Sequence, residues 1–207
     1  CGGWGANISD EGSGYEIGLK AVKTSLRELD GTAPLSLLTK EITGMNKPFS
    51  AVENCGDLTR LRDNVRARLF PLERSHIASY CMKAGECSAE GDTVAQSLFI
   101  EAGKELAEVV IRTYRKIDLQ KPADIIVSGG LVKAKKFWQG AFEGSLKEEI
   151  SVSSIRYEPD GLMKAVIKTV QGGKIDGLSK RTDCILPGTG GEPLSQSGSD
   201  CPAGTGG

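Results

Sequence analysis

Five consecutive segments with helical periodicity separate the glycine-rich opening, residues 1–14, which is predicted to be a loop and a short strand, from the next strand-type segment. This order restricts the fold more than any other feature of the sequence. In the first segment, apolar residues recur at spacings of three and four with charged residues between them, which is typical of an amphipathic helix. The predicted helices cover residues 15–29, 35–43, 57–69, 73–88 and 92–117. We expect Asp30-Gly31 to end the first helix and Asp92 to cap the last one. Such a run of helices excludes an all-β fold.

Two strand-type segments follow these helices. Residues 123–127 are a short apolar run that ends at Ser128-Gly129-Gly130, which predicts a buried strand. Residues 150–157 alternate between apolar and polar side chains, and this period of two predicts a second strand. Further helices are predicted over residues 133–149, between the strands, and over residues 159–170. The sequence therefore predicts a helix-rich α/β fold.

Composition excludes several functional classes. The 207 residues carry 26 basic and 27 acidic side chains, so the sequence lacks the basic excess that drives binding to nucleic acid or anionic membranes. No apolar run approaches the ~20 residues of a membrane-spanning helix, and the first residues lack a signal-peptide pattern. The six cysteines are scattered and His76 is the only histidine, so no protein-held metal site is expected. We expect a cytoplasmic protein with reduced thiols and with neither nucleic-acid nor membrane partners.

The chain is long enough to bury one hydrophobic core. Residues 1–178 are predicted to form this single ordered domain. Residues 179–207 are dominated by Gly, Ser, Pro and Thr, without periodic apolar residues, and are predicted to be a disordered tail.

The first motif that could bind a ligand is the glycine-rich opening. It consists of Gly2-Gly3-Trp4-Gly5, followed by Asp10-Glu11-Gly12-Ser13-Gly14. Glycine lets the backbone approach a ligand closely, a tryptophan offers a flat apolar face, and a carboxylate can accept hydrogen bonds from neighbouring hydroxyl groups. These properties suit a sugar. The same residues could equally form a tight turn before a helix, with Asp10 favoured near the positive helix end.

The second motif is Ser128-Gly129-Gly130, between the predicted strand and the following helix. Backbone at a glycine-rich strand-to-helix turn can lie against a nucleotide. Such turns also use glycine for geometry alone, so this motif by itself leaves both interpretations open.

Together and in this order, the two motifs resemble the C-terminal lobe of N-acetylglucosamine kinases, within the BadF/BadG/BcrA/BcrD-type ATPase family. That family belongs to the actin-like, hexokinase and heat-shock chaperone superfamily. The resemblance also covers Gly91-Asp92 with its long helix and extends from about Gly2 to Gly173. It implies a ribonuclease H-like lobe of the actin type and transfer of a phosphoryl group from ATP, with Mg²⁺, to an amino sugar, most simply N-acetylglucosamine.

The resemblance also implies roles for individual residues. Gly3, Trp4, Gly5 and Asp10 would contact the sugar, whereas Ser88, Ser128, Gly129 and Gly130 would contact the nucleotide. The family's phosphate-binding hairpin and its catalytic aspartate precede the Gly-Gly-Trp-Gly segment. The resemblance therefore places no catalytic residue in this chain and makes an N-terminal lobe its partner in the active site.

Other interpretations stay open, and the nearest is a sugar kinase of the same kind with another hexosamine as its substrate. A Cys201-Pro-Ala-Gly-Thr-Gly206 segment resembles an element of the family's iron–sulfur branch, the ATPase activators of 2-hydroxyacyl-CoA dehydratases. A lobe of this kind could also bind a sugar or a protein partner without chemistry. An exposed interlobe face would favour a homodimer.

Overall fold

The computed structural model describes residues 10–70, 73–117 and 120–159. In chain order its elements are α1 (Gly14–Leu29), α2 (Leu37–Thr43), the 3₁₀ helix η1 (Phe49–Ala51), α3 (Cys55–Leu69), α4 (Arg74–Ala89), α5 (Thr93–Lys116), β1 (Ala123–Ser128), the 3₁₀ helix η2 (Gly130–Phe137), α6 (Gln139–Glu149) and β2 (Val152–Glu158). The predicted helix-rich α/β architecture is confirmed at this level. The helix predicted over residues 159–170, the boundary near residue 178 and the tail lie outside the described residues.

Short polar side chains cap the starts of α1, α2, α3 and α5. Ser13 caps α1 by accepting a hydrogen bond from the Glu16 amide, at 3.1 Å. Asp92 caps α5 through Oδ1, which accepts from the Ala95 amide at 2.8 Å, and its Oδ2 accepts from the Leu38 amide of α2 at 2.9 Å. One carboxylate therefore satisfies free amides at the starts of two helices, which confirms the predicted cap and fixes α2 against α5.

Glycine allows two close helix contacts in the core. α1 packs on α4, and a Cβ atom at Gly18 would lie 2.0 Å from the Ile77 carbonyl oxygen. α5 packs on α6, and a Cβ atom at Gly103 would lie 2.6 Å from the Trp138 carbonyl oxygen. The core itself includes the buried side chains of Ile17, Leu29, Leu38, Ile42, Phe99, Trp138, Phe142 and Leu146.

No helix among the described residues is both long and apolar enough to span a membrane.

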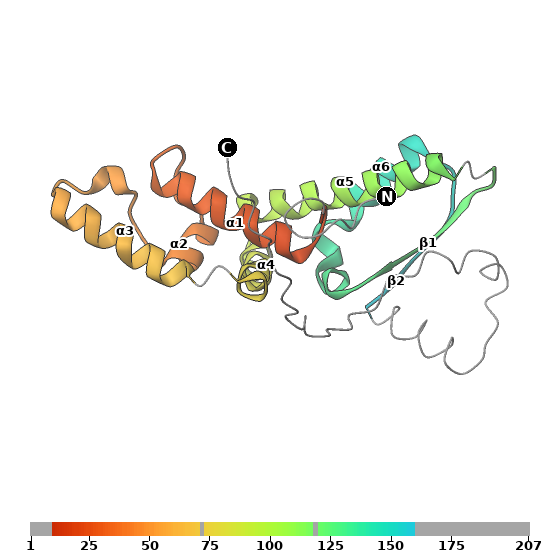
Figure 1. Cartoon of the computed structure of the whole chain (residues 1–207). Helices are drawn as coiled ribbons and strands as arrows, with labels where there is room; N and C mark the ends of the chain where they lie inside the picture. Colours follow the sequence, from red (N-terminus) through yellow and green to blue (C-terminus); the bar gives the residue numbers. More distant parts are fainter. Residues whose placement is uncertain (1–9, 71–72, 118–119, 160–207) are drawn as a thin grey trace, which may run out of the picture. The chain divides into compact units, whose positions relative to one another are not determined.

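β1 and β2 lie side by side as a parallel pair, with Ile125 opposite Ile155 (Figure 1). Parallel strands require a long connection, which η2 and α6 supply here. Both predicted strands are confirmed, but the prediction that β1 is buried is wrong for one of its faces. Ala123 and Ile125 are buried, whereas the Ile126 side chain on the opposite face is 53% exposed.

The helix predicted over residues 133–149 is also corrected. The structure has the 3₁₀ helix η2 in the first part of this range, and α6 begins only at Gln139. Backbone at Ala134 and Trp138 departs from helical geometry. The Trp138 ring is fully buried and its Nε1 donates to the Leu131 carbonyl oxygen at 3.1 Å. Anchoring this large side chain interrupts the helix between η2 and α6.

Candidate functional site

The first part of the site is the turn that leads into α1. The Asp10 carbonyl oxygen accepts a hydrogen bond from the Ser13 amide at 3.0 Å, which closes the turn. Gly12 has φ +70°, and a Cβ atom there would lie 3.0 Å from both the Ala102 carbonyl oxygen and the Leu106 Cβ. The left-handed backbone and the close approach to α5 both require glycine. The fold itself therefore explains Gly12.

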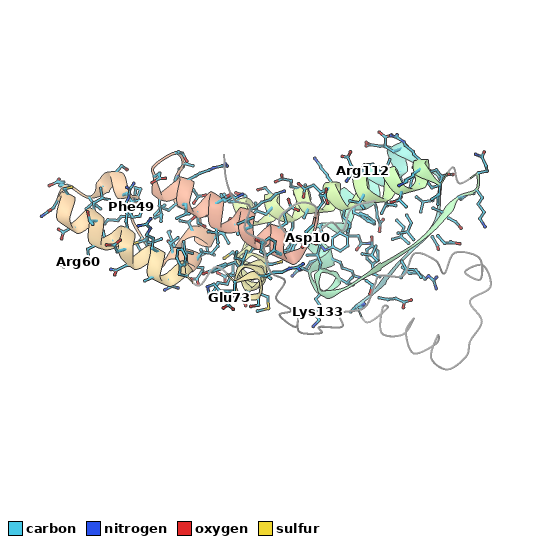
Figure 2. The ribbon with its side chains drawn as sticks, viewed as in Figure 1. Asp10, Phe49, Arg60, Glu73, Arg112 and Lys133 are labelled. Carbon is cyan, nitrogen blue, oxygen red and sulfur yellow. The ribbon has the colours of Figure 1, made fainter. Side chains whose placement is uncertain are left out.

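Two consecutive carboxylates in this turn pair with arginines from different helices. Asp10 Oδ2 lies 3.0 Å from Arg74 Nη2 at the start of α4, and Glu11 Oε1 lies 3.6 Å from Arg112 Nη2 in α5. Figure 2 shows Asp10 at the start of α1 and Arg112 on α5. The Asp10 side chain is only 23% exposed. This carboxylate is therefore held in place, with part of its surface open to a solute.

The second part of the site is the turn from β1 into η2. Gly129 has φ +115°, and its amide donates to the Pro159 carbonyl oxygen at 3.3 Å. Apart from the adjoining residues, no atom of the described chain lies within 4 Å of the positions that a Cβ atom would take at Gly129 or Gly130. Gly129 is required by its backbone conformation. Gly130 has no such conformation and no close neighbour, so nothing within the described chain requires glycine there.

Both turns line one cavity of about 420 Å³. Residues 12–14 form one wall, residues 125–132 form another, and Leu106, Val110 and Phe142 close it with apolar side chains. The structure therefore brings the two sequence motifs together, although more than a hundred residues separate them in the chain. This volume lies within the ordinary range for small-molecule sites.

A second cavity of about 610 Å³ lies between α4 and η2. It shares Gly14, Gly130 and Leu131 with the first cavity. Its other lining residues are Ala78, Cys81, Met82, Gly85, Glu86, Ala89, Lys133, Ala134, Lys136 and Phe137. A mostly apolar groove with a few charged groups suits a flat organic ligand that carries polar substituents. Figure 2 shows Lys133 at the η2 side of this region.

Burial disfavours ionisation of the one thiol that lines this groove, Cys81. Burial raises the pKa of Cys81 from 9.0 to about 11, because a thiolate is poorly solvated there. Cys81 is therefore a neutral, apolar part of the groove wall.

Asp10 precedes the lining residues 12–14 and lines neither cavity itself, and Ser88 lies elsewhere. Ser88 is buried, and its hydroxyl donates to the Ala84 carbonyl oxygen at 2.7 Å. Its neighbours Gly85, Glu86 and Ala89 line the second cavity, but Ser88 lines neither cavity. Gly3, Trp4 and Gly5 lie outside the described residues. Within the part of the chain that the structure describes, no three His, Cys, Asp or Glu side chains form a group that could hold a metal ion.

Sequence reasoning missed Arg74 and the groove between α4 and η2. Arg74 meets Asp10 across 64 residues of sequence, and no local pattern signals such a pairing. The groove has a weak sequence signal, since Ala78, Cys81, Gly85 and Ala89 recur at spacings of three and four along α4. Small residues at that spacing indicate a helix face that something approaches closely.

The sequence model of the BadF/BadG/BcrA/BcrD ATPase family matches residues 1–167 of the chain. The chain therefore belongs to this family, in agreement with the motifs and with the helix-rich α/β fold.

Two kinases are among its relatives. The chain is 27% identical to an N-acetylmuramic acid/N-acetylglucosamine kinase of Clostridium acetobutylicum over 168 residues, which cover 80% of the chain and 52% of that protein. It is 25% identical to an N-acetyl-D-glucosamine kinase of Dictyostelium discoideum over 138 residues, which cover 65% of the chain and 40% of the relative. The chain thus spans about half the length, or less, of the curated relatives that it matches.

Proposed function

We propose that the chain is the C-terminal, ribonuclease H-like lobe of an ATP-dependent amino-sugar kinase, with N-acetylglucosamine as the simplest substrate. The observation that carries the proposal is the shared cavity, in which the turn after Asp10 meets the turn at Ser128–Gly130. A phosphotransferase must hold its two substrates next to each other. The names of the two relatives supply the chemical class of the sugar.

Asp10 is the proposed sugar ligand within the described residues. Its carboxylate can accept hydrogen bonds from two neighbouring hydroxyl groups, and the Arg74 contact at 3.0 Å fixes its orientation. Gly3, Trp4 and Gly5 are proposed to complete the sugar site. These three assignments rest on the resemblance of the Gly-Gly-Trp-Gly segment to the kinase motif.

The nucleotide is proposed to lie along Ser128, Gly129 and Gly130, with its adenosine in the groove between α4 and η2. Gly130 supports this proposal because its open surroundings leave room for a ligand and the fold gives no other reason for glycine. Ser88 would act indirectly, since its hydroxyl binds its own helix while Ala89 and Gly85 line the groove. When bound, ATP supplies the phosphoryl group, with Mg²⁺ as its counter-ion.

The general base and the phosphate-binding hairpin are proposed to belong to an N-terminal lobe. Closure of the two lobes would exclude water from the reacting groups. The chain's own contribution is then to bind and orient the sugar and the nucleoside.

The proposal is tested by ADP release from the full-length gene product, with ATP, Mg²⁺ and a panel of hexosamines. We expect ADP release that depends on an N-acetylated amino sugar and that falls strongly in Asp10→Ala. Glu11→Ala is the matched control, because it removes the neighbouring carboxylate, which faces α5. ATP hydrolysis that ignores every sugar would contradict the proposal and favour an ATPase of the activator type. Sugar binding without ADP release would favour a non-catalytic lobe.

A further inference from the structure

Trp138 is anchored by three elements of the core. Its ring is fully buried, and the ring centres of Phe142 in α6 and Tyr157 in β2 lie 5.6 and 5.8 Å from its own, both edge-on. α5 meets Trp138 through Gly103, where a Cβ atom would lie 2.6 Å from the Trp138 carbonyl oxygen. Glycine destabilises a helix interior relative to alanine, but its place within α5 lets the Trp138 backbone approach. The position of this tryptophan is therefore fixed by α5, α6 and β2.

The anchored indole reaches back to the start of η2. Its Nε1 donates a hydrogen bond to the Leu131 carbonyl oxygen at 3.1 Å. Leu131 directly follows Gly130 and lines both cavities, whereas Trp138 lines neither. The backbone between Leu131 and Trp138 is kinked at Ala134, so regular helical geometry does not fix one end of η2 relative to the other. The indole hydrogen bond joins these two ends and holds the turn at a fixed position relative to the core.

Backbone hydrogen bonds hold this turn less firmly. The Gly129 amide donates to the Pro159 carbonyl oxygen at 3.3 Å, and the Val132 amide donates to the Gly129 carbonyl oxygen at 3.2 Å. Both distances exceed the about 2.9–3.0 Å that is most common for an N–H···O hydrogen bond. The consecutive glycines Gly129 and Gly130 also make many backbone conformations accessible. A side chain that restricts this turn in advance reduces the conformational entropy that is lost when a ligand binds.

We propose that Trp138 is a positioning residue for nucleotide binding. Its indole N–H holds the Leu131 carbonyl group, and thereby holds Gly130 at the place where the nucleotide meets the turn. This inference rests on the proposed function, because it takes residues 128–130 as part of the nucleotide site. The competing role is core packing alone: if the ring of Trp138 only fills space, the affinity for ATP does not depend on its N–H group.

The experiment separates the N–H group of Trp138 from the volume of its ring. In the full-length gene product, Trp138 is replaced by benzothienylalanine through stop-codon suppression, which puts sulfur in place of the N–H group and keeps the bicyclic ring. Trp138→Phe is a second variant that lacks the donor. Leu146→Ala is the matched control, because Leu146 is fully buried in α6 and lines neither cavity. Calorimetric titration measures the dissociation constants of ATP and N-acetylglucosamine, and urea denaturation measures the stability of each variant.

Both Trp138 variants should bind ATP about threefold to tenfold more weakly, as expected when one neutral hydrogen bond no longer holds the turn. Their affinity for N-acetylglucosamine should stay nearly unchanged, because the proposed sugar ligand Asp10 belongs to the turn before α1. The benzothienylalanine variant should keep most of its stability. Leu146→Ala should lose stability through the cavity that it creates and should keep both affinities.

Two results would overturn the inference and leave the proposed function intact. Unchanged ATP affinity in the benzothienylalanine variant would reduce Trp138 to core packing. An equal loss of ATP affinity in Leu146→Ala would attribute the effect to general destabilisation. Absence of ATP binding by the unmodified protein would reject the proposed function, and this inference with it.

Discussion

The two glycine turns of the site differ in what requires their glycines. At the turn before α1, Gly12 is buried, has φ +70° and would collide with α5 if it carried a side chain. At the turn after β1, Gly130 is exposed, and apart from its chain neighbours no described residue comes within 4 Å of the position that a Cβ atom would take. The first glycine is explained by the fold. The second has no such explanation within the described residues, and the proposed function assigns it to nucleotide binding. The comparison teaches that similar glycine motifs differ in how much of their composition the fold itself requires.

The largest expected effect is a loss of stability at the turn before α1, called the enclosed turn here because α5 covers Gly12. Gly12→Val should lower the free energy of unfolding by roughly 2 to 4 kcal/mol, because it combines a strained backbone with overpacking against Ala102 and Leu106. Urea denaturation followed by circular dichroism measures this change. Gly130→Val is the matched control, with an expected change within about 0.5 kcal/mol. Similar losses in the two variants would remove the contrast between the turns.

The Asp10→Ala substitution tests whether the enclosed turn also binds the sugar. In the full-length gene product, Asp10→Ala should weaken binding of N-acetylglucosamine by about tenfold to a hundredfold, which corresponds to ~1.5 to 3 kcal/mol for a charge-assisted hydrogen bond. The affinity for ATP should change little. Calorimetric titration with each ligand measures the two effects separately. Equal losses for both ligands, or no loss for either, would remove Asp10 from the sugar site.

A substitution in the turn after β1, the open turn, should change ATP affinity and leave sugar affinity unchanged. Gly130→Val should reduce the affinity for ATP by about tenfold and leave sugar affinity and stability nearly unchanged, because the added side chain occupies ligand space only. The substitution at Gly129 is less informative, since φ +115° at that position strains any other residue. Unchanged ATP affinity in a folded Gly130→Val variant would show that the nucleotide does not use this turn.

The smallest expected effect is on Cys81, in the wall of the groove beside Gly130. With its pKa at about 11, this thiol should carry about a hundredfold less thiolate at pH 8 than a cysteine at the reference pKa. Alkylation by iodoacetamide should therefore be slow, should accelerate as the pH rises toward 11, and should slow by a further few-fold when ATP is added. Peptide mass mapping compares Cys81 with the exposed Cys55, whose alkylation ATP should leave unchanged. ATP-independent alkylation of Cys81 would place the nucleotide elsewhere.

The helices and strands were largely predictable because their apolar periodicity records which face is buried. The exceptions have physical causes. Trp138 fits the helical spacing, but its buried ring and its hydrogen bond to Leu131 interrupt the helix predicted there. Ile126 belongs to an apolar run and is nevertheless half exposed, because the run alone does not say which faces of a strand are covered.

The site was only partly predictable. The glycine motifs marked both turns, and the resemblance to the kinases supplied their order. Their meeting in one cavity depends on how α1, α5 and β1 pack, which local sequence does not encode. The pair formed by Asp10 and Arg74 is a long-range contact of the same kind.

The most direct test of the central claim is the fate of the phosphoryl group. Phosphorus NMR of the full-length gene product with ATP, Mg²⁺ and N-acetylglucosamine distinguishes transfer to the sugar from transfer to water. Because the two turns are proposed to hold the sugar beside the nucleotide, we predict a sugar phosphate ester that accumulates together with ADP, with little inorganic phosphate. ADP that accumulates with inorganic phosphate alone would contradict the proposed kinase and leave only an ATPase.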